Sequence, residues 1–269
     1  MTREQKVSTL IQYLKQENQG YASIPDPIDE GEQRRLLRSL MNVRYPGHAS
    51  AEYEKLQDEL LQEEAEEKGI VTCNDIPVIE QEYPCSEIKN SDRISLWRGD
   101  ITRLGVDAIV NAANSQLLGC FVPCHGCIDN AIHSAAGIQL RNECAEIMAE
   151  QGHEEPIGKA KITKGYNLPA KHVIHTVGPI VGLAVTEKQK EQLKDCYLNC
   201  LKVAEKSSLK SIAFCCISTG EFHFPNDKGA EIAVDTVTKF IKQRKAAFDR
   251  IVFNVFKDGD RKLYEKLLS

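Results

Sequence analysis

A short loop in the middle of the chain concentrates side chains that bind metal ions. Residues 119 to 129 read Gly-Cys-Phe-Val-Pro-Cys-His-Gly-Cys-Ile-Asp. Thiolate sulfur and imidazole nitrogen are the preferred ligands of zinc, and Cys120, His125 and Cys127 can supply three of them. Three protein ligands leave a coordination position for water or substrate, as catalytic zinc sites do. The residue types in this loop therefore favour a zinc site that carries out chemistry.

Two other interpretations of the loop stay open on spacing alone. Cys124 and Cys127 form a Cys-X-X-Cys pair, which in a cytosolic protein can be a redox couple. Buried free cysteines are also common, and this chain has ten cysteines, so their clustering can arise by chance. A closed structural zinc site usually shows a second pair of ligands, and we find none near this loop in the sequence.

The composition is that of an ordinary globular protein. The 269 residues are 42% hydrophobic and 27% charged, enough for one large domain or for a medium domain with a smaller appendage. The sequence shows neither an apolar run of about eighteen residues nor a secretory signal, so we expect no membrane partner, a cytoplasmic location and reduced thiols. The net charge of −5 argues against a nucleic-acid partner and favours backbone amides as the contacts of any phosphorylated ligand.

Two parts of the chain have different patterns. Residues 1–85 are polar and charged, with apolar residues at spacings of three and four, which predicts an extension of amphipathic helices. A packing or lid role is favoured for this extension over direct binding. In residues 86–269, short apolar runs alternate with helical stretches, which predicts an α/β fold with a parallel or mixed sheet. The apolar runs are 94–97, 108–111, 173–177, 212–217 and 251–255, and helices are expected from about Asn130, Glu187 and Asp227 and at the C-terminus.

Ligands of such α/β folds bind beyond the carboxyl ends of the strands. The loops 111–129 and 218–226 both follow predicted strands and therefore occupy this position.

Four blocks resemble, in the same order, the macrodomain family of ADP-ribose-binding modules. They are 98–102 (Arg-Gly-Asp-Ile-Thr), 107–115 (Asp-Ala-Ile-Val-Asn-Ala-Ala-Asn-Ser), 131–133 (Ala-Ile-His) and 217–220 (Ile-Ser-Thr-Gly). The resemblance covers about residues 90 to 269 and implies a three-layer α/β/α macrodomain with a mixed central sheet. The loop 120–127 resembles that of a zinc-dependent microbial subclass linked to sirtuins, whose members also carry an N-terminal helical extension. The choice of Cys120 over Cys124 as a zinc ligand rests on this family pattern.

The resemblance implies roles for individual residues. Asp100 would accept a hydrogen bond from the adenine amino group, although a turn cap is the alternative. The loop 218–222 would hold phosphate through its N–H groups, with Phe222 facing the distal ribose. Asn114 would bind the distal ribose, whereas Asn111 is as well explained by a structural role. The expected ADP-ribose-binding residues are Asp100, Ile101, Asn114, Cys127, Ile128, Asp129, Ser218, Thr219, Gly220, Glu221 and Phe222.

Asp129 and Asn114 are the expected catalytic residues. Asp129 would orient or deprotonate a water, or hold the ribose, and its alternative role is to cap the helix that follows. His133 is expected to be structural. Zinc could activate a water or position the substrate, and because two thiolates reduce its Lewis acidity, both roles stay open.

The function implied by the resemblance is hydrolytic removal of mono-ADP-ribose from modified proteins, with release of ADP-ribose. The implied substrate is a lipoyl-carrier protein related to glycine cleavage, modified by a sirtuin-type ADP-ribosyltransferase. A non-catalytic reader of ADP-ribose and a deacetylase of O-acetyl-ADP-ribose are the alternatives.

Overall fold

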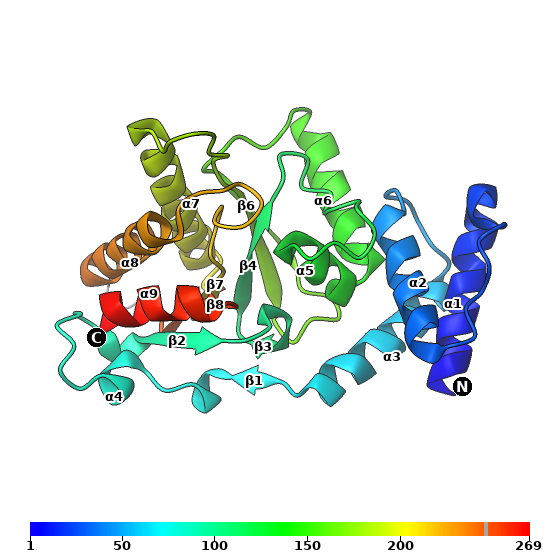
Figure 1. Cartoon of the computed structure of the whole chain (residues 1–269), viewed down its shortest axis with the longest axis horizontal. Coiled ribbons are helices and arrows are strands. Elements are labelled where there is room, and N and C mark those ends of the chain that lie inside the picture. The colour runs from blue at the N-terminus through cyan, green and yellow to red at the C-terminus, as the bar shows by residue number, and fades with distance from the viewer. Residues whose placement is uncertain (245–246) are drawn as a thin grey trace.

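The N-terminal helices form a separate layer at one end of the molecule (Figure 1). The computed structural model describes residues 1–244 and 247–269. The extension contains α1 (Arg3–Glu17), α2 (Glu30–Val43) and α3 (Ala51–Lys68). Thr2, Asp29 and Ser50 cap these helices by accepting N–H groups of the first turn. Leu10 and Leu60 are fully buried in the small core between the helices, which explains the apolar spacing in the sequence.

A six-stranded mixed sheet forms the centre of the second part. Its strands lie in the order β2 (Ile94–Arg98), β8 (Arg250–Val255), β7 (Ser211–Phe214), β4 (Ala108–Ala113), β6 (His172–Val177) and β5 (Ala160–Lys164). Every neighbouring pair is parallel except β5 with β6. The central strand β4 is almost wholly buried because helices cover both faces of the sheet.

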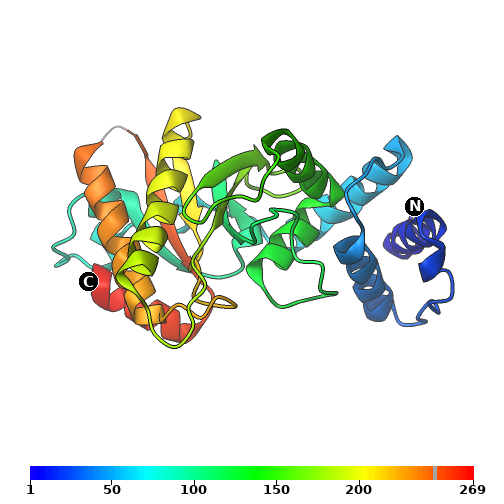
Figure 2. The same ribbon diagram turned by 90° about the horizontal axis from the view of Figure 1, so that it is seen from above.

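The helices complete a three-layer α/β/α fold (Figures 1 and 2). One group contains α7 (Glu187–Lys206), α8 (Asn226–Gln243) and α9 (Asp258–Leu268), which pack side by side, and the other contains α5 (Ile128–Ala136) and α6 (Ile138–Gln151). The short elements β1 (Val71–Thr72) and α4 (Ile79–Glu82) belong to the connection from the extension, and β3 (Leu104–Gly105), which follows β2, pairs with β1. The predicted fold class is confirmed. Within the described residues, no helix is long and apolar enough to cross a membrane.

Several predicted boundaries were wrong. Strand β7 ends at Phe214 instead of residue 217, and β5 was not predicted. Asp129 is not the cap of α5, because Cys127 precedes the helix and its Sγ accepts the Asn130 N–H group at 3.4 Å. The boundary expected after residue 85 stays a prediction, although Ile76 already belongs to the core of the sheet.

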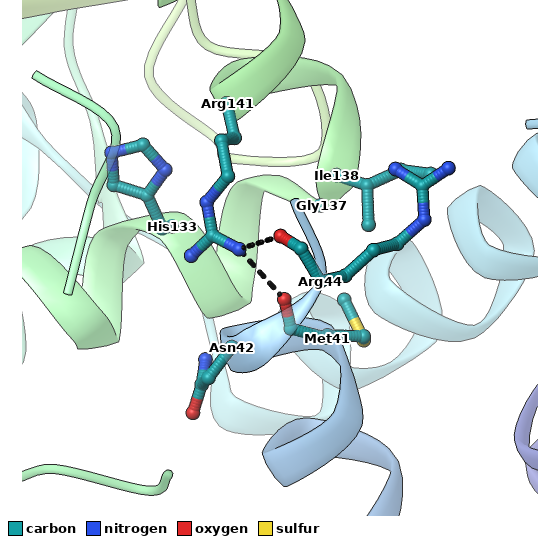
Figure 3. A pocket seen from close by; sticks show the side chains of 7 residues that line it. All are labelled: Met41, Asn42, Arg44, His133, Gly137, Ile138 and Arg141. Atoms are coloured by element: carbon teal, nitrogen blue, oxygen red, sulfur yellow. Dashed lines mark hydrogen bonds between the residues drawn. The ribbon is translucent and has the colours of Figure 1, made fainter. Parts of the chain in front are cut away.

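Arg141 joins the extension to the second part of the molecule (Figure 3). Its Nη1 donates to the carbonyls of Met41 and Arg44 at the end of α2, and its Nε donates to the carbonyl of Leu118. The guanidinium also lies 4.4 Å from the centroid of the Phe121 ring. Burial lowers the pKa of Arg141 to about 10, which leaves it charged at neutral pH. This buried cation therefore links α2 to the chain at Leu118, just before the loop 119–127, which we call the metal-type loop.

Candidate active site

The loop between β4 and α5 brings the three predicted zinc ligands together. The ligand atoms of Cys120, His125 and Cys127 all lie within 4.8 Å of one another, and Cys120 Sγ is 3.6 Å from His125 Nδ1. These three side chains, which we call the metal-type group, are all half-buried. Burial raises the pKa of the Cys127 thiol to about 12, so this thiol keeps its proton at neutral pH unless a cation displaces it. Two sulfurs and one imidazole at these separations fit the donor set that zinc prefers.

Cys124 does not belong to this group of three. Its Sγ instead donates to the carbonyl of Arg35 at 3.5 Å and lies 3.8 Å from the hydroxyl of Ser39, both on α2. The residue has a φ of +52°, a left-handed conformation that places its main chain at a sharp turn of the loop. The two members of the Cys-X-X-Cys pair therefore have different surroundings: Cys127 lies with Cys120 and His125, and Cys124 lies against α2.

A cleft of about 390 Å³ opens at the carboxyl ends of the parallel strands. This is the position that the fold predicts for a ligand. The residues expected to bind a ligand that line the cleft are Asp100, Ile101, Cys127, Ile128, Ser218, Thr219, Gly220, Glu221 and Phe222. Cys127 therefore belongs both to the metal-type group and to the wall of the cleft.

Both roles considered for Asp100 have support in its surroundings. Its Oδ1 accepts from the N–H and the hydroxyl of Thr102, at 3.0 and 2.7 Å, which is a turn cap. The residue also lines the cleft, together with the neighbouring Ile101.

Sequence reasoning missed several residues of the same wall. Phe256 follows β8, is 75% exposed and offers a flat apolar surface to the cleft, while Asn226 and Asp260 are hydrogen-bonded to each other beside it. An aromatic residue directly after the buried run 251–255 was the available signal for Phe256. The other residues lacked such a signal because they come from helices whose positions depend on the fold.

The loop 218–222 presents main-chain donors. Ser218 has a φ of +64°, and the turn is closed by hydrogen bonds from Phe224 N to Ser218 O and from His223 N to Gly220 O. Within the described residues, the N–H groups of Gly220, Glu221 and Phe222 have no protein acceptor. Successive unpaired N–H groups at such a turn form a concavity that binds anions.

The two loops approach each other across the cleft. His125 Nε2 and Glu221 Oε1 are 3.8 Å apart, one from each loop. The turn 218–222 and the metal-type group therefore lie at one end of the cleft. Asp100 and Phe256 belong to loops that follow other strands, β2 and β8.

Asn114 and Asp129 are not among the residues that line the cleft. The amide of Asn114 donates to the carbonyl of Gly119 and accepts the N–H of Gln116, both at 3.0 Å, so it shapes the start of the loop. Asp129 is 6% exposed, and its Oδ1 accepts from Asn111 Nδ2 at 2.8 Å. Burial raises the pKa of Asp129 to about 6, although the Asn111 hydrogen bond acts in the opposite direction.

A second group of side chains that could bind a metal ion is buried next to Asp129. The ligand atoms of His133, Cys144 and His175 are also within 4.8 Å of one another, and all three residues are buried. His175 contacts Asn111 through Nδ1 at 3.1 Å and Thr163 through Nε2 at 3.0 Å. Burial lowers the pKa of both histidines, that of His175 to about 3. They are therefore neutral at physiological pH.

Comparison with known proteins shows the family to which this fold belongs. Residues 110–233 match the Macro domain family model, and the chain belongs to the macrodomain family.

Individual relatives support this assignment. A protein-ADP-ribose hydrolase of Treponema medium is 52% identical over 269 residues, the whole length of both chains. A protein-ADP-ribose hydrolase of Staphylococcus aureus strain MRSA252 is 48% identical over 235 residues, 87% of this chain and 84% of that protein. The Trypanosoma brucei macrodomain solved in complex with ADP-ribose has a TM-score of 0.67 and 31% identity, over 86% of this chain and 95% of that one.

Proposed function

We propose that this chain is a zinc-dependent hydrolase that removes mono-ADP-ribose from modified proteins and releases ADP-ribose. The observation that carries the proposal is the double position of Cys127, which belongs to the metal-type group and also lines the cleft. The names of the Treponema and Staphylococcus relatives support the activity. Cys120, His125 and Cys127 would hold the metal, which when bound supplies positive charge that polarises an oxygen of the ligand.

The cleft walls suggest how the chain's own residues hold ADP-ribose. Asp100 would accept a hydrogen bond from the adenine amino group, the main-chain N–H of Ile101 would offer a donor beside it, and Phe256 would cover the base. The free N–H groups of Gly220, Glu221 and Phe222 would bind the diphosphate as fixed dipoles. The distal ribose would then lie beside Cys127 and Ile128, next to the metal-type group.

Asp129 and Asn114 would act at the reacting end of the ligand. Asp129, held by Asn111, would accept a proton from water or fix the ribose hydroxyls after a small rotation toward the cleft. Asn114 would set the position of the loop through Gly119 and offer its amide to the ribose. The proposed protein substrate is a lipoyl-carrier protein related to glycine cleavage, modified by a sirtuin-type ADP-ribosyltransferase.

Single-turnover release of ADP-ribose from a mono-ADP-ribosylated protein tests this function. The purified chain is assayed with measured zinc content, then after chelation, and again after zinc is restored. We expect release to fall with chelation and to return with zinc. Release that ignores zinc would contradict the metal requirement. Tight binding of ADP-ribose without release by the zinc-loaded chain would identify a reader instead.

A further inference from the structure

Helix α2 of the extension contacts the metal-type loop directly. The Oδ1 atom of Asn42 accepts the main-chain N–H of Cys124 at 2.9 Å, and its Nδ2 donates to the hydroxyl of Ser134 at 2.9 Å. Asn42 is 1% exposed, so both bonds are shielded from water. A buried side-chain amide whose oxygen and nitrogen are both hydrogen-bonded holds its partners in one geometry. The partner at Cys124 is the residue whose φ is +52°.

A second contact between α2 and the loop passes through Asn130, the third residue of α5. Arg38 Nη2 donates to Asn130 Oδ1 at 2.7 Å and lies 3.5 Å from the carbonyl of His125. The Nδ2 of Asn130 donates to the carbonyl of Val122 at 3.0 Å, and its main-chain N–H donates to Cys127 Sγ at 3.4 Å. Arg38 thus holds the side chain of Asn130, which contacts the middle of the loop, while the main-chain N–H of the same residue contacts the sulfur of Cys127.

We propose that Asn42 and Arg38 are positioning residues for the metal-type loop, so that the extension builds part of the site instead of only packing beside it. This inference rests on the proposed function. Arg38 and Asn42 lie one helical turn apart, so both side chains project from the same face of α2. The loop supplies the ligands, but its turn at Cys124 and its middle at Val122 are held from α2 and α5.

The physical reason is the cost of ordering the ligands. A loop with a left-handed residue at its turn samples other conformations unless its polar groups are held. Holding the loop before the metal arrives lowers the entropy lost on binding, which raises metal affinity. Outer contacts that orient metal ligands are typically worth about 10-fold to 100-fold in affinity or activity.

The test compares two buried amides of the extension in the full chain. Asn42→Leu removes both hydrogen bonds with little change in volume. Gln57→Leu is the matched control, because Gln57 is fully buried in α3 and its Oε1 accepts the main-chain N–H of Ile138 at 3.1 Å, away from the loop. Zinc affinity is measured by competition with a chromophoric chelator, alongside thermal stability and the Kd for ADP-ribose.

We expect both variants to lower the melting temperature, but only Asn42→Leu to weaken zinc binding, by about 10-fold to 100-fold. Asn42→Asp, which keeps the acceptor for the Cys124 N–H group, should recover most of the zinc affinity. Cys124→Ala should retain zinc affinity, because it removes only the thiol and leaves the main-chain bond to Asn42. Binding of ADP-ribose should change little in all four variants, since the adenine and diphosphate walls lie outside the contact.

A folded Asn42→Leu protein with wild-type zinc affinity would overturn the inference. If Asn42→Leu does not fold, Arg38→Met provides the same comparison, and unchanged zinc affinity in that variant would overturn it equally. Equal losses of zinc affinity in Asn42→Leu and Gln57→Leu would mean that the effect comes from lower overall stability, and this result would also contradict the proposal. A wild-type chain that binds no zinc would instead overturn the proposed function together with this inference.

Discussion

The two groups of ligand-type side chains in this molecule differ in what surrounds them. Cys120, His125 and Cys127 are half-buried and reach the cleft through Cys127, whereas His133, Cys144 and His175 are buried, with His133 Nε2 3.5 Å from Asp129 Oδ1. Both groups have their ligand atoms within 4.8 Å. The residue types and distances are therefore similar in the two places, and the environment must distinguish them.

The surroundings of His133, Cys144 and His175, the inner group, disfavour binding of a cation, in contrast to those of the metal-type group, the outer group. His175 is already hydrogen-bonded through both ring nitrogens, to Asn111 and Thr163. The buried guanidinium of Arg141 acts on the inner group, where it further lowers the pKa of His133. Burial raises the pKa of the Cys144 thiol as it raises that of Cys127, so the thiols do not distinguish the two groups. A metal site needs access and favourable charge as well as suitable atoms, and here only the outer group has access to the cleft.

Loss of an outer ligand should have the largest effect. We expect Cys127→Ala to lose zinc and to slow ADP-ribose release by about 1,000-fold or more, because metal polarisation is worth several kcal/mol. Metal analysis and single-turnover kinetics measure the two changes. A variant that keeps both zinc and rate would remove the distinction between the two groups.

Asp129 lies between the groups, two residues after Cys127 and with its Oδ1 3.5 Å from His133 Nε2. If it acts in proton transfer, Asp129→Asn should slow release by about 100-fold to 10,000-fold and retain zinc. Loss of zinc in this variant would show that the carboxylate organises the metal-type loop, and an unchanged rate would assign Asp129 to the structural inner group.

The inner group should control stability in acid. Because burial lowers the pKa of His175 to about 3, the folded chain keeps this ring neutral at pH values where the unfolded chain protonates it. The free energy of unfolding therefore falls as the pH drops below about 6.5, by about 1.4 kcal/mol per pH unit for this residue. His175→Asn should have a shallower pH slope by this amount.

Urea unfolding at a series of pH values, with a chelator present throughout, measures that slope. His48→Asn is the control for removing a histidine, since His48 is exposed. An equal slope in wild type and His175→Asn would mean that the buried ring does not remain neutral on acidification.

The smallest effect is expected at the inner thiol. Cys144→Ala should lower the free energy of unfolding by about 1–2 kcal/mol, through lost contacts and a small cavity, without changing zinc content. Denaturant unfolding and metal analysis check this together. Loss of one equivalent of zinc in this variant would reveal a second metal and contradict the comparison.

The sequence predicted the architecture better than its boundaries. Alternating apolar runs were sufficient for the sheet, but β5 reads Ala-Lys-Ile-Thr-Lys and is polar because it lies at the sheet edge. The break between α5 and α6 at Gly137 also escaped prediction. A Cβ there would lie 2.6 Å from Gln57 Nε2, a contact that only the docked extension creates.

The site was predicted where its residues are close in sequence. The loop 119–127 has its own chemical signal and the family resemblance indicated the turn 218–222, and residues of both line one cleft. The contact between Asn42 and Cys124 joins positions 82 residues apart, and nothing in the local pattern of α2 indicates it. This separation explains why the sequence favoured only a packing or lid role for the extension.

The contacts of Asn130 limit how this site can be transplanted by protein engineering. Its single side chain accepts from Arg38 and Ser134 and donates to Val122, so the loop, α2 and α5 meet at one amide. A graft of residues 119–127 alone would carry the proposed metal ligands but would leave the Cys124 N–H without its acceptor and the Val122 carbonyl without its donor. The minimal transferable module is therefore discontinuous and includes α2 and the first turns of α5.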